Sequence, residues 1–302
     1  MTTRIGLAGV PTSAGSHNPG QEEAPAAWRA AGMLEALTAA GIDVRDYGDL
    51  PPHPFHPGPT VDGARDLDRV LDVCQQTAAL VQRICEDGRR PLILGGDCTI
   101  TLGVVAGLSG HEDLGLIYFD GDADLAAPAT NATGVLDTMG MTHLLGRGVD
   151  AFKTLGASGV ALPADHIVLF GFDPAELDTG EWTQVLVDGL LAMPAPRVRR
   201  SPLEAAGVAL AHLDSCSRYL VHFDVDVLHT GLFPLANFPH FNGLSLEEVA
   251  ACLERFLARP ECAGLVVTEV NPHHDPDGTL LAALRDTVVH AATGLVDEAR
   301  LG

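Results

Sequence analysis

The sequence has little basic charge. Of its 302 residues, 18 are Lys or Arg and 40 are Asp or Glu, which gives a formal net charge of −22, and Lys153 is the sole lysine. Nucleic acids and anionic membranes are bound by clustered Lys and Arg, so we expect neither as a partner. An acidic surface attracts small cationic ligands, although solubility alone accounts for most of this charge.

Long apolar runs are also missing, and the first residues do not have the pattern expected of a leader segment. No stretch reaches the roughly 18 consecutive apolar residues of a membrane span. The N-terminus, MTTRIGLAGVPTSAG, has no basic segment followed by an apolar one with a cleavage site. The six cysteines are scattered without a CxxC pair, which is typical of buried thiols in a reducing compartment. We therefore expect a cytoplasmic protein with no membrane segment.

Apolar runs typical of buried strands alternate with helix-like segments. Continuous Val, Ile and Leu runs indicate strands covered on both faces, and their alternation with helices indicates a parallel sheet between helical layers. Strands are expected at 4–10, 91–97, 115–120, 166–172, 219–227 and 264–270, a helix at 23–41 and a surface loop at 50–63. We predict one α/β domain over 1–302, with three layers (α/β/α) and a mainly parallel sheet.

Polar residues end four of the expected strands, in the motifs GGDCT (95–99), DGDAD (120–124), DVD (224–226) and EVNP (269–272). Ligands bind at the carboxyl ends of parallel strands, so the four motifs should share one site. Five aspartates cannot all stay ionised in a partly buried cleft without positive charge, which divalent ions such as Mn²⁺ or Mg²⁺ would supply. DGDAD alone would also suit a Ca²⁺ loop or an acidic turn; the second cluster favours a catalytic metal site.

These motifs stand, in order, where the ureohydrolase family of arginases and agmatinases has GGDHS, DAHxD, SxDxDxxDP and EVNP. The chain resembles that family along nearly its whole length. The resemblance implies an arginase-like fold and a metal-dependent amidinohydrolase. Two Mn²⁺ ions would hold a hydroxide that attacks a guanidinium carbon and releases urea and an amine. It also implies a small cationic guanidino substrate and a homo-oligomer.

The resemblance assigns roles to individual residues. The metal ligands would be Cys98, Asp120, Asp122, Asp124, Asp224 and Asp226. Asp120 and Asp224 would bridge the ions, and Asp120 would also orient the hydroxide. Glu269 would accept the guanidinium in a two-bond ion pair. The other positions matching substrate contacts are Thr133, Asp137, Asp173 and Glu176, with Asp137 at the position of a proton-shuttling His.

The chain departs from the family at both metal-ligand histidines, which are replaced by Cys98 and Asp122. Five aspartates and a thiolate would leave two negative charges in excess beside two divalent ions. Three outcomes stay open: Cys98 is a protonated thiol and weak ligand, one ion is absent, or the substrate's guanidinium supplies the charge. Cys98 could also be a small buried hydrophobe.

The substrate segment departs from the arginase pattern as well. Ala126 and Val135 replace the two Asn that hold the amino acid in arginases, so free L-arginine should bind poorly. Val135 and Met139 predict an apolar entrance. We expect a guanidino-bearing chain, as in a natural product of secondary metabolism, or else a modified arginine such as N-hydroxyarginine.

Two other functions stay open: a non-catalytic arginase-like binding protein, and a hydrolase of a formimino or other amidine bond. The remaining histidines receive little weight. His222 is expected to point away from Asp224, and His273 and His274 are expected at the entrance or in solvent.

Overall fold

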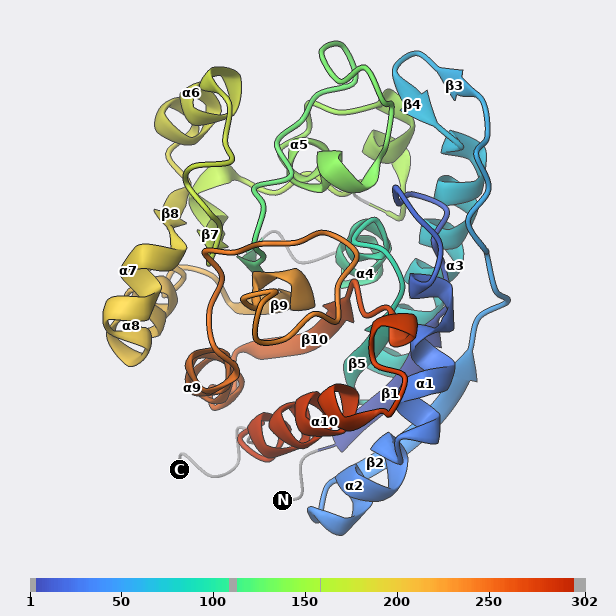
Figure 1. Cartoon of the computed structure of the whole chain (residues 1–302), viewed down its shortest axis with the longest axis vertical. Coiled ribbons are helices and arrows are strands. Elements are labelled where there is room, and N and C mark those ends of the chain that lie inside the picture. Colours follow the sequence, from blue (N-terminus) through green and yellow to red (C-terminus); the bar gives the residue numbers. More distant parts are fainter. Residues whose placement is uncertain (1–3, 109–112, 158, 296–302) are drawn as a thin grey trace.

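An eight-stranded sheet forms the centre of the chain. The computed structural model describes residues 4–108, 113–157 and 159–295. The strand order is β2-β1-β5-β10-β9-β6-β7-β8, and every neighbouring pair is parallel (Figure 1). The strands are β1 (Arg4–Val10), β2 (Asp43–Asp49), β5 (Arg90–Gly95), β6 (Leu114–Phe119), β7 (Ile167–Phe170), β8 (Leu191–Met193), β9 (Arg218–Asp224) and β10 (Cys262–Thr268). A separate antiparallel hairpin joins β3 (Thr60–Val61) to β4 (Ala64–Arg65).

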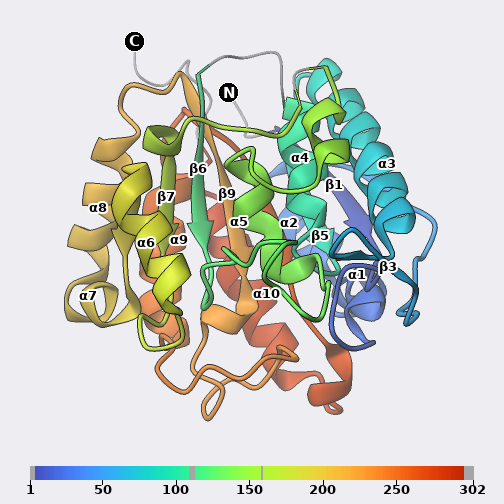
Figure 2. The same cartoon turned by 90° about the horizontal axis from the view of Figure 1, so that it is seen from above.

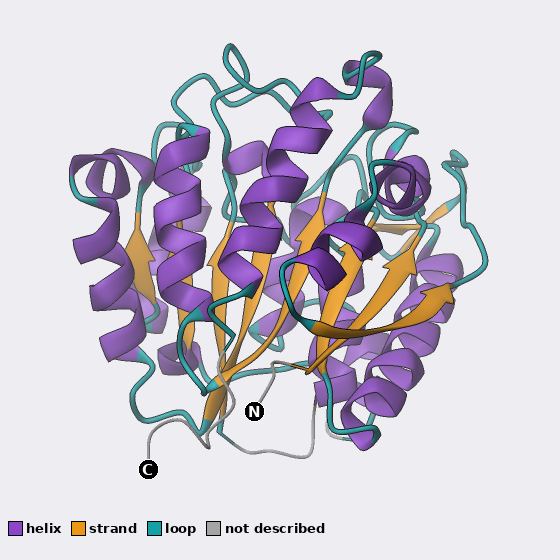
Figure 3. Cartoon of the chain, turned by 90° about the horizontal axis from the view of Figure 1, so that it is seen from below, coloured by secondary structure: helices purple, strands orange, loops and turns teal. Residues whose placement is uncertain are grey.

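Helices cover both faces of this sheet. One face carries α3 (Leu67–Glu86), α4 (Ile100–Leu108), α5 (Gly140–Leu144) and α6 (Thr179–Asp188) (Figure 2). The opposite face carries α1 (Ala24–Ala30), α2 (Met33–Ala39), α7 (Ala195–Arg200), α8 (Pro202–His212), α9 (Leu246–Leu257) and α10 (Thr279–Ala292) (Figure 3). The predicted α/β class, with three layers and a parallel sheet, is confirmed. None of the described helices is long and apolar enough to cross a bilayer.

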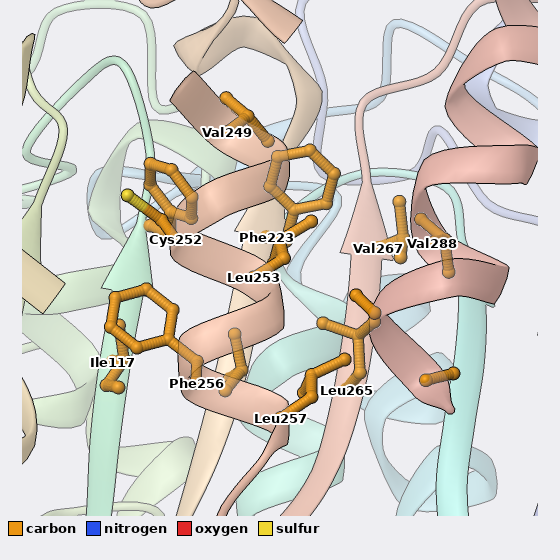
Figure 4. Packing of buried hydrophobic residues seen from close by; sticks show 14 of the residues in the cluster. Ile117, Phe223, Val249, Cys252, Leu253, Phe256, Leu257, Leu265, Val267 and Val288 are labelled. Atoms are coloured by element: carbon orange, nitrogen blue, oxygen red, sulfur yellow. The ribbon is translucent and has the colours of Figure 1, made fainter. Parts of the chain in front are cut away.

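The alternation of side chains along each strand divides the core into two clusters. In β6, Leu116 and Tyr118 join the cluster under α3 and α4, whereas Ile117 and Phe119 join the cluster under α8 and α9. Figure 4 shows this second cluster, with Phe256 of α9 packed over the sheet near Ile117. Continuous apolar runs are needed here because both faces of every central strand are buried.

Local boundaries differ from the sequence prediction in several places, among them the short edge strand β8 (Leu191–Met193), which was not predicted. The helix expected at 23–41 is two helices, because the chain turns at Gly32, where φ is 80°. The edge strand β2 was not predicted, since its sequence DVRDYGD is mostly polar and none of its residues is fully buried. Within the loop expected at 50–63, residues 60–61 form the short strand β3.

Candidate metal and active site

The polar motifs that follow β5, β6, β9 and β10 surround one cavity of about 250 Å³. All six predicted metal ligands line it, as do Asp137 and Glu269. Two further segments complete the wall, one after β1 with His17, Asn18 and Gln21, the other after β9 with Asn237 and Phe238. The sequence thus predicts correctly which four strand ends meet.

Backbone N–H groups hold the aspartates in place. Asp120 Oδ1 accepts a hydrogen bond from the N–H of Asp122 at 2.7 Å, and Asp224 Oδ1 accepts one from the N–H of Asp226, also at 2.7 Å. Asp226 Oδ1 accepts from the N–H of Gly121 at 3.0 Å, which ties the loop after β9 to the loop after β6. Asp120 and Asp224 therefore each keep Oδ2 for a ligand, whereas Asp226 Oδ2 lies 3.3 Å from His240 Nε2.

The aspartates of this cavity are buried, so their ionised forms need positive charge nearby. Burial, together with the charges of Asp226 and Asp224, raises the pKa of Asp120 well above its usual range. Burial and Asp122 do the same to the pKa of Asp124, and burial and Asp226 to the pKa of Asp224. Ionised carboxylates at this density are stable only beside cations.

Four ligand-capable atoms converge at the centre of the cavity wall. They belong to Cys98, Asp120, His222 and Asp224, they are buried, and they all lie within 4.8 Å of one another. Cys98 Sγ lies 2.6 Å from Asp224 Oδ2, and His222 Nε2 lies 3.4 Å from Asp120 Oδ2. This group could hold a metal ion.

The expectation for His222 was wrong. Residues two apart on a strand share a face, so His222 and Asp224 of β9 point to the same side and not to opposite sides. The His222 ring stacks on Tyr118 with 4.1 Å between centroids, and its Nδ1 lies 2.7 Å from the Thr101 hydroxyl. Burial lowers the pKa of His222 to about 3, so the ring is neutral.

His240 is a site residue that sequence reasoning missed. Its ring is fully buried, with Nδ1 at 2.9 Å from Glu176 Oε2 and Nε2 at 3.3 Å from Asp226 Oδ2. The N–H directions do not meet hydrogen-bond geometry, so these are ion-pair contacts. Burial alone would lower the pKa of His240, but Asp226 and Glu176 raise it to about 10. His240 comes from an irregular loop with no motif, so spacing gave no signal.

Glu269 follows β10 with a left-handed backbone, φ 65°, which turns its carboxylate into the cavity. Oε2 accepts a hydrogen bond from Gln21 Nε2 at 2.8 Å, whereas the buried Oε1 has no hydrogen-bond partner. The Ser13 hydroxyl donates to Gln21 Oε1 at 3.1 Å and so orients the amide. Gln21 was also missed, because it precedes a helix far from the four motifs.

Asp137 lies beside this carboxylate. Its Oδ1 accepts a hydrogen bond from the N–H of Cys98 at 2.8 Å, and it forms a second convergent group with Cys98 and Glu269. Burial and the charge of Asp97 raise the pKa of Asp137 well above its usual range. Its position at the cavity wall suits the proton-transfer role that the resemblance implies.

Thr133, Asp173 and Glu176, the other predicted substrate contacts, are not among the described residues that line this cavity. The Thr133 hydroxyl donates to Asn131 Oδ1 at 2.6 Å, Asp173 Oδ2 accepts from Asn242 Nδ2 at 2.7 Å, and Glu176 contacts His240. Their roles toward a substrate stay predictions.

The expectation of an apolar entrance made by Val135 and Met139 was wrong, because both side chains are fully buried. Met139 joins the cluster of buried residues under α3 and α4 instead. Phe238 is the apolar residue at the cavity wall, and 49% of it is exposed.

A model of the arginase family matches residues 3–295. The chain belongs to the arginase family. Human arginase-1 is 30% identical over 275 residues, which cover 89% of this chain and 85% of the relative. Arginase from Brevibacillus brevis is 28% identical over 278 residues, which cover 90% of this chain and 92% of the relative. The family predicted from the four motifs is thus confirmed.

Solved structures agree with this assignment to the arginase family. Arginase from Bacillus subtilis superposes with a TM-score of 0.84 at 26% identity, covering 97% of this chain and 98% of that one. A formimidoylglutamase from the same species shares the fold, with a TM-score of 0.77 at 19% identity. The superposition covers 99% of this chain and 89% of that one. As a member of the arginase family, the chain is a hydrolase of guanidino or amidino C–N bonds.

Proposed function

We propose that the chain hydrolyses a guanidino group to urea and an amine, on a cationic substrate other than free L-arginine. The observation that carries the proposal is the buried, unpartnered Oε1 of Glu269 in a cavity lined by seven carboxyl groups. None of the described lining residues is Lys or Arg, so the cavity favours a cation over an anion.

Glu269 is placed to receive the guanidinium. Gln21 holds Oε2, and the unpartnered Oε1 can accept a guanidinium N–H in a charge-assisted hydrogen bond. A buried carboxylate without a partner is unfavourable, and the arriving cation removes that penalty. Binding energy is therefore concentrated at the group that reacts.

The acidic cluster would hold the metal, with Cys98, Asp120 and Asp224 among its ligands, and Mn²⁺ is the ion that the family resemblance implies. When bound, a divalent ion here would supply deprotonated water at neutral pH. Asp137 Oδ1 accepts from the Cys98 N–H, which leaves Oδ2 to carry a proton to the departing amine. Asp120 Oδ2 faces the same centre and would orient the attacking water.

The residues at and around the cavity are poorly suited to bind the α-carboxylate of an amino-acid substrate. An α-carboxylate needs several donors once it is desolvated. Ala126 offers no side-chain donor, Val135 is buried, and the Thr133 hydroxyl is already bonded to Asn131. The loop after β9 instead exposes large apolar side chains, namely Leu232, Phe238 and Phe241. These features support a substrate whose guanidino group ends a longer, less polar chain.

Urea release across a substrate panel tests the proposal. The metal-loaded protein would receive agmatine, guanidinobutyrate, long-chain alkylguanidines, N-hydroxyarginine and L-arginine. We expect urea from the chains without an amino-acid head group, with kcat/KM for L-arginine at least about a hundredfold lower, the effect of about 3 kcal/mol of lost carboxylate contacts. Glu269→Gln is the control for site-specific turnover.

Three results would defeat the proposal. L-Arginine as the best substrate would contradict the argument from the cavity walls, and no urea from any member would favour a non-catalytic binding protein. Ammonia or formamide without urea would move the assignment to a formimino substrate. A cytoplasmic location and a homo-oligomeric state stay predictions.

A further inference from the structure

We propose that the site holds one divalent ion, bound by Cys98, Asp120, His222 and Asp224, and that the His240 imidazole takes the place of a second ion. The ion belongs to the borderline class of Zn²⁺, not to the hard class of Mn²⁺. The inference rests on the proposed function, since hydrolysis would use this ion with water as a fifth ligand, but its test measures binding and not turnover.

The donor atoms define the class of metal. One sulfur, one imidazole nitrogen and two carboxylate oxygens are all donors that Zn²⁺ accepts, whereas Mn²⁺ and Mg²⁺ prefer oxygen donors alone. Bond lengths of about 2.0–2.3 Å place ligand atoms of a tetrahedral zinc about 3.3–3.8 Å apart. His222 Nε2 and Asp120 Oδ2 are already 3.4 Å apart. Cys98 Sγ and Asp224 Oδ2, at 2.6 Å, would separate by about 1 Å to admit the ion.

His222 is held as metal-binding histidines are held. In such sites the second ring nitrogen is bonded to a neighbouring group, which fixes the ring and its tautomer. Here the Thr101 hydroxyl lies 2.7 Å from Nδ1, and the ring stacks on Tyr118 at 4.1 Å. When the hydroxyl accepts from Nδ1–H, the lone pair of Nε2 faces the cluster. His222 of β9 thus supplies an imidazole ligand, which Cys98 and Asp122 do not provide.

The place of a second ion is already filled. Asp226 would have to bind that ion, but its Oδ1 accepts from the Gly121 N–H at 3.0 Å and its Oδ2 lies 3.3 Å from His240 Nε2. The other ring nitrogen faces Glu176 Oε2 at 2.9 Å. The ring packs so tightly on Gly121 that a Cβ there would lie 2.6 Å from His240 Cδ2. A histidine between two carboxylates therefore occupies this corner of the cluster.

Metal content and cobalt substitution test the inference directly. Purified protein from cells grown with both zinc and manganese should contain one ion per chain, with zinc in excess over manganese. The Co²⁺ form should show a thiolate-to-cobalt charge-transfer band in the near ultraviolet and the intense visible bands of a tetrahedral site.

Three variants assign the ligands. Cys98→Ser should abolish the charge-transfer band. His222→Phe keeps the ring on Tyr118 but should weaken Zn²⁺ binding at least about tenfold. Asp226→Asn is the matched control, and it should leave both the band and the one-ion stoichiometry unchanged.

Two ions per chain, a cobalt form without the charge-transfer band, or His222→Phe with unchanged Zn²⁺ affinity would each overturn the inference. The first two are read from the wild-type protein, so a poorly folding variant does not decide the matter. One bound zinc without urea release would defeat the proposed function and leave the inference standing. Urea release with two bound manganese ions would overturn the inference and support the proposed function.

Discussion

Glu269, the proposed partner of the substrate guanidinium, has two features that cost stability. It combines a left-handed backbone, φ 65°, with a buried carboxylate oxygen that has no hydrogen-bond partner. Burial and the charge of Asp137 raise its pKa well above the usual range, which shows that the ionised form is poorly accommodated. Such features persist where the surrounding structure enforces them and are typical of functional sites.

We therefore predict that Glu269→Gln changes activity and stability in opposite directions. Loss of the charged partner for guanidinium should lower kcat/KM about a hundredfold or more, while removal of the buried charge should raise the free energy of unfolding by about 1 kcal/mol. Urea-release kinetics and denaturant unfolding of the metal-free protein measure the two effects. Gln21→Leu, which removes the hydrogen bond to Oε2 but keeps the carboxylate, should lower kcat/KM about tenfold. A Glu269→Gln protein that is less stable than the wild type would contradict this account.

A second prediction concerns His143 of α5. Its Nδ1 lies 2.6 Å from the carbonyl oxygen of Met139, its ring packs edge-on against Phe152, and burial lowers its pKa to about 4. The unfolded state binds a proton below about pH 6.5, and the folded state does so only near pH 4. Stability from neutral His143 is therefore present above pH 6.5 and is lost as the pH falls toward 4.

In His143→Asn, the decrease in the free energy of unfolding between pH 6.5 and pH 4 should be smaller by on the order of 2 kcal/mol. The free energy of unfolding of the metal-free protein, measured by urea denaturation between pH 4 and 8, provides the comparison. His56→Asn, at an exposed position, is the control and should keep the wild-type slope. An unchanged slope in His143→Asn would show that another group causes the acid sensitivity.

Sequence reasoning identified the site residues that end strands and missed those that reach the site from elsewhere. Asp120, Asp224 and Glu269 were predictable, because carboxylates directly after buried apolar runs have no structural use there. Gln21 and His240 come from loops, and only the folded chain shows that they contact Glu269 and Asp226.

At the scale of elements, the buried strands were predictable and the polar edge strand was not. β6 and β9 read as continuous apolar runs because helices cover both their faces, whereas β2 at the sheet edge has a polar sequence. The exposed edge strand β2 is therefore held by its pairing with β1 more than by its own pattern.

Helix α9 offers a test at this scale. Ser245 and Glu248 form a capping box: the Ser245 hydroxyl accepts from the Glu248 N–H at 3.3 Å, and the Glu248 carboxylate accepts from the Ser245 N–H at 2.9 Å. Ser245→Ala should lower the free energy of unfolding by about 1 kcal/mol, whereas Ser245→Thr should have little effect. Thermal and urea unfolding of the three proteins measure this. Equal losses in both variants would point to packing and not to the cap.

At the scale of the whole molecule, the formal charge of −22 should act on the substrate from a distance. A cationic guanidino compound is attracted at low ionic strength, and salt screens this attraction because the Debye length falls to about 3 Å at 1 M. We expect KM to rise several-fold between low and high NaCl concentration while kcat stays constant. Inhibition by urea, a neutral product, should not change over the same range. A salt-independent KM would mean that local contacts alone determine binding.

The position of β10 affects how the enzyme is made. β10 is the last strand of the described residues, yet it lies between β5 and β9 at the centre of the sheet. Until residues 262–268 leave the ribosome, β5 and β9 each present an unpaired inner edge, a form of strand prone to pairing with other chains. The same step delivers Glu269. During biosynthesis the sheet and the proposed catalytic centre are therefore completed together, and we expect a nascent chain that stops short of this strand to be both inactive and exposed to aggregation.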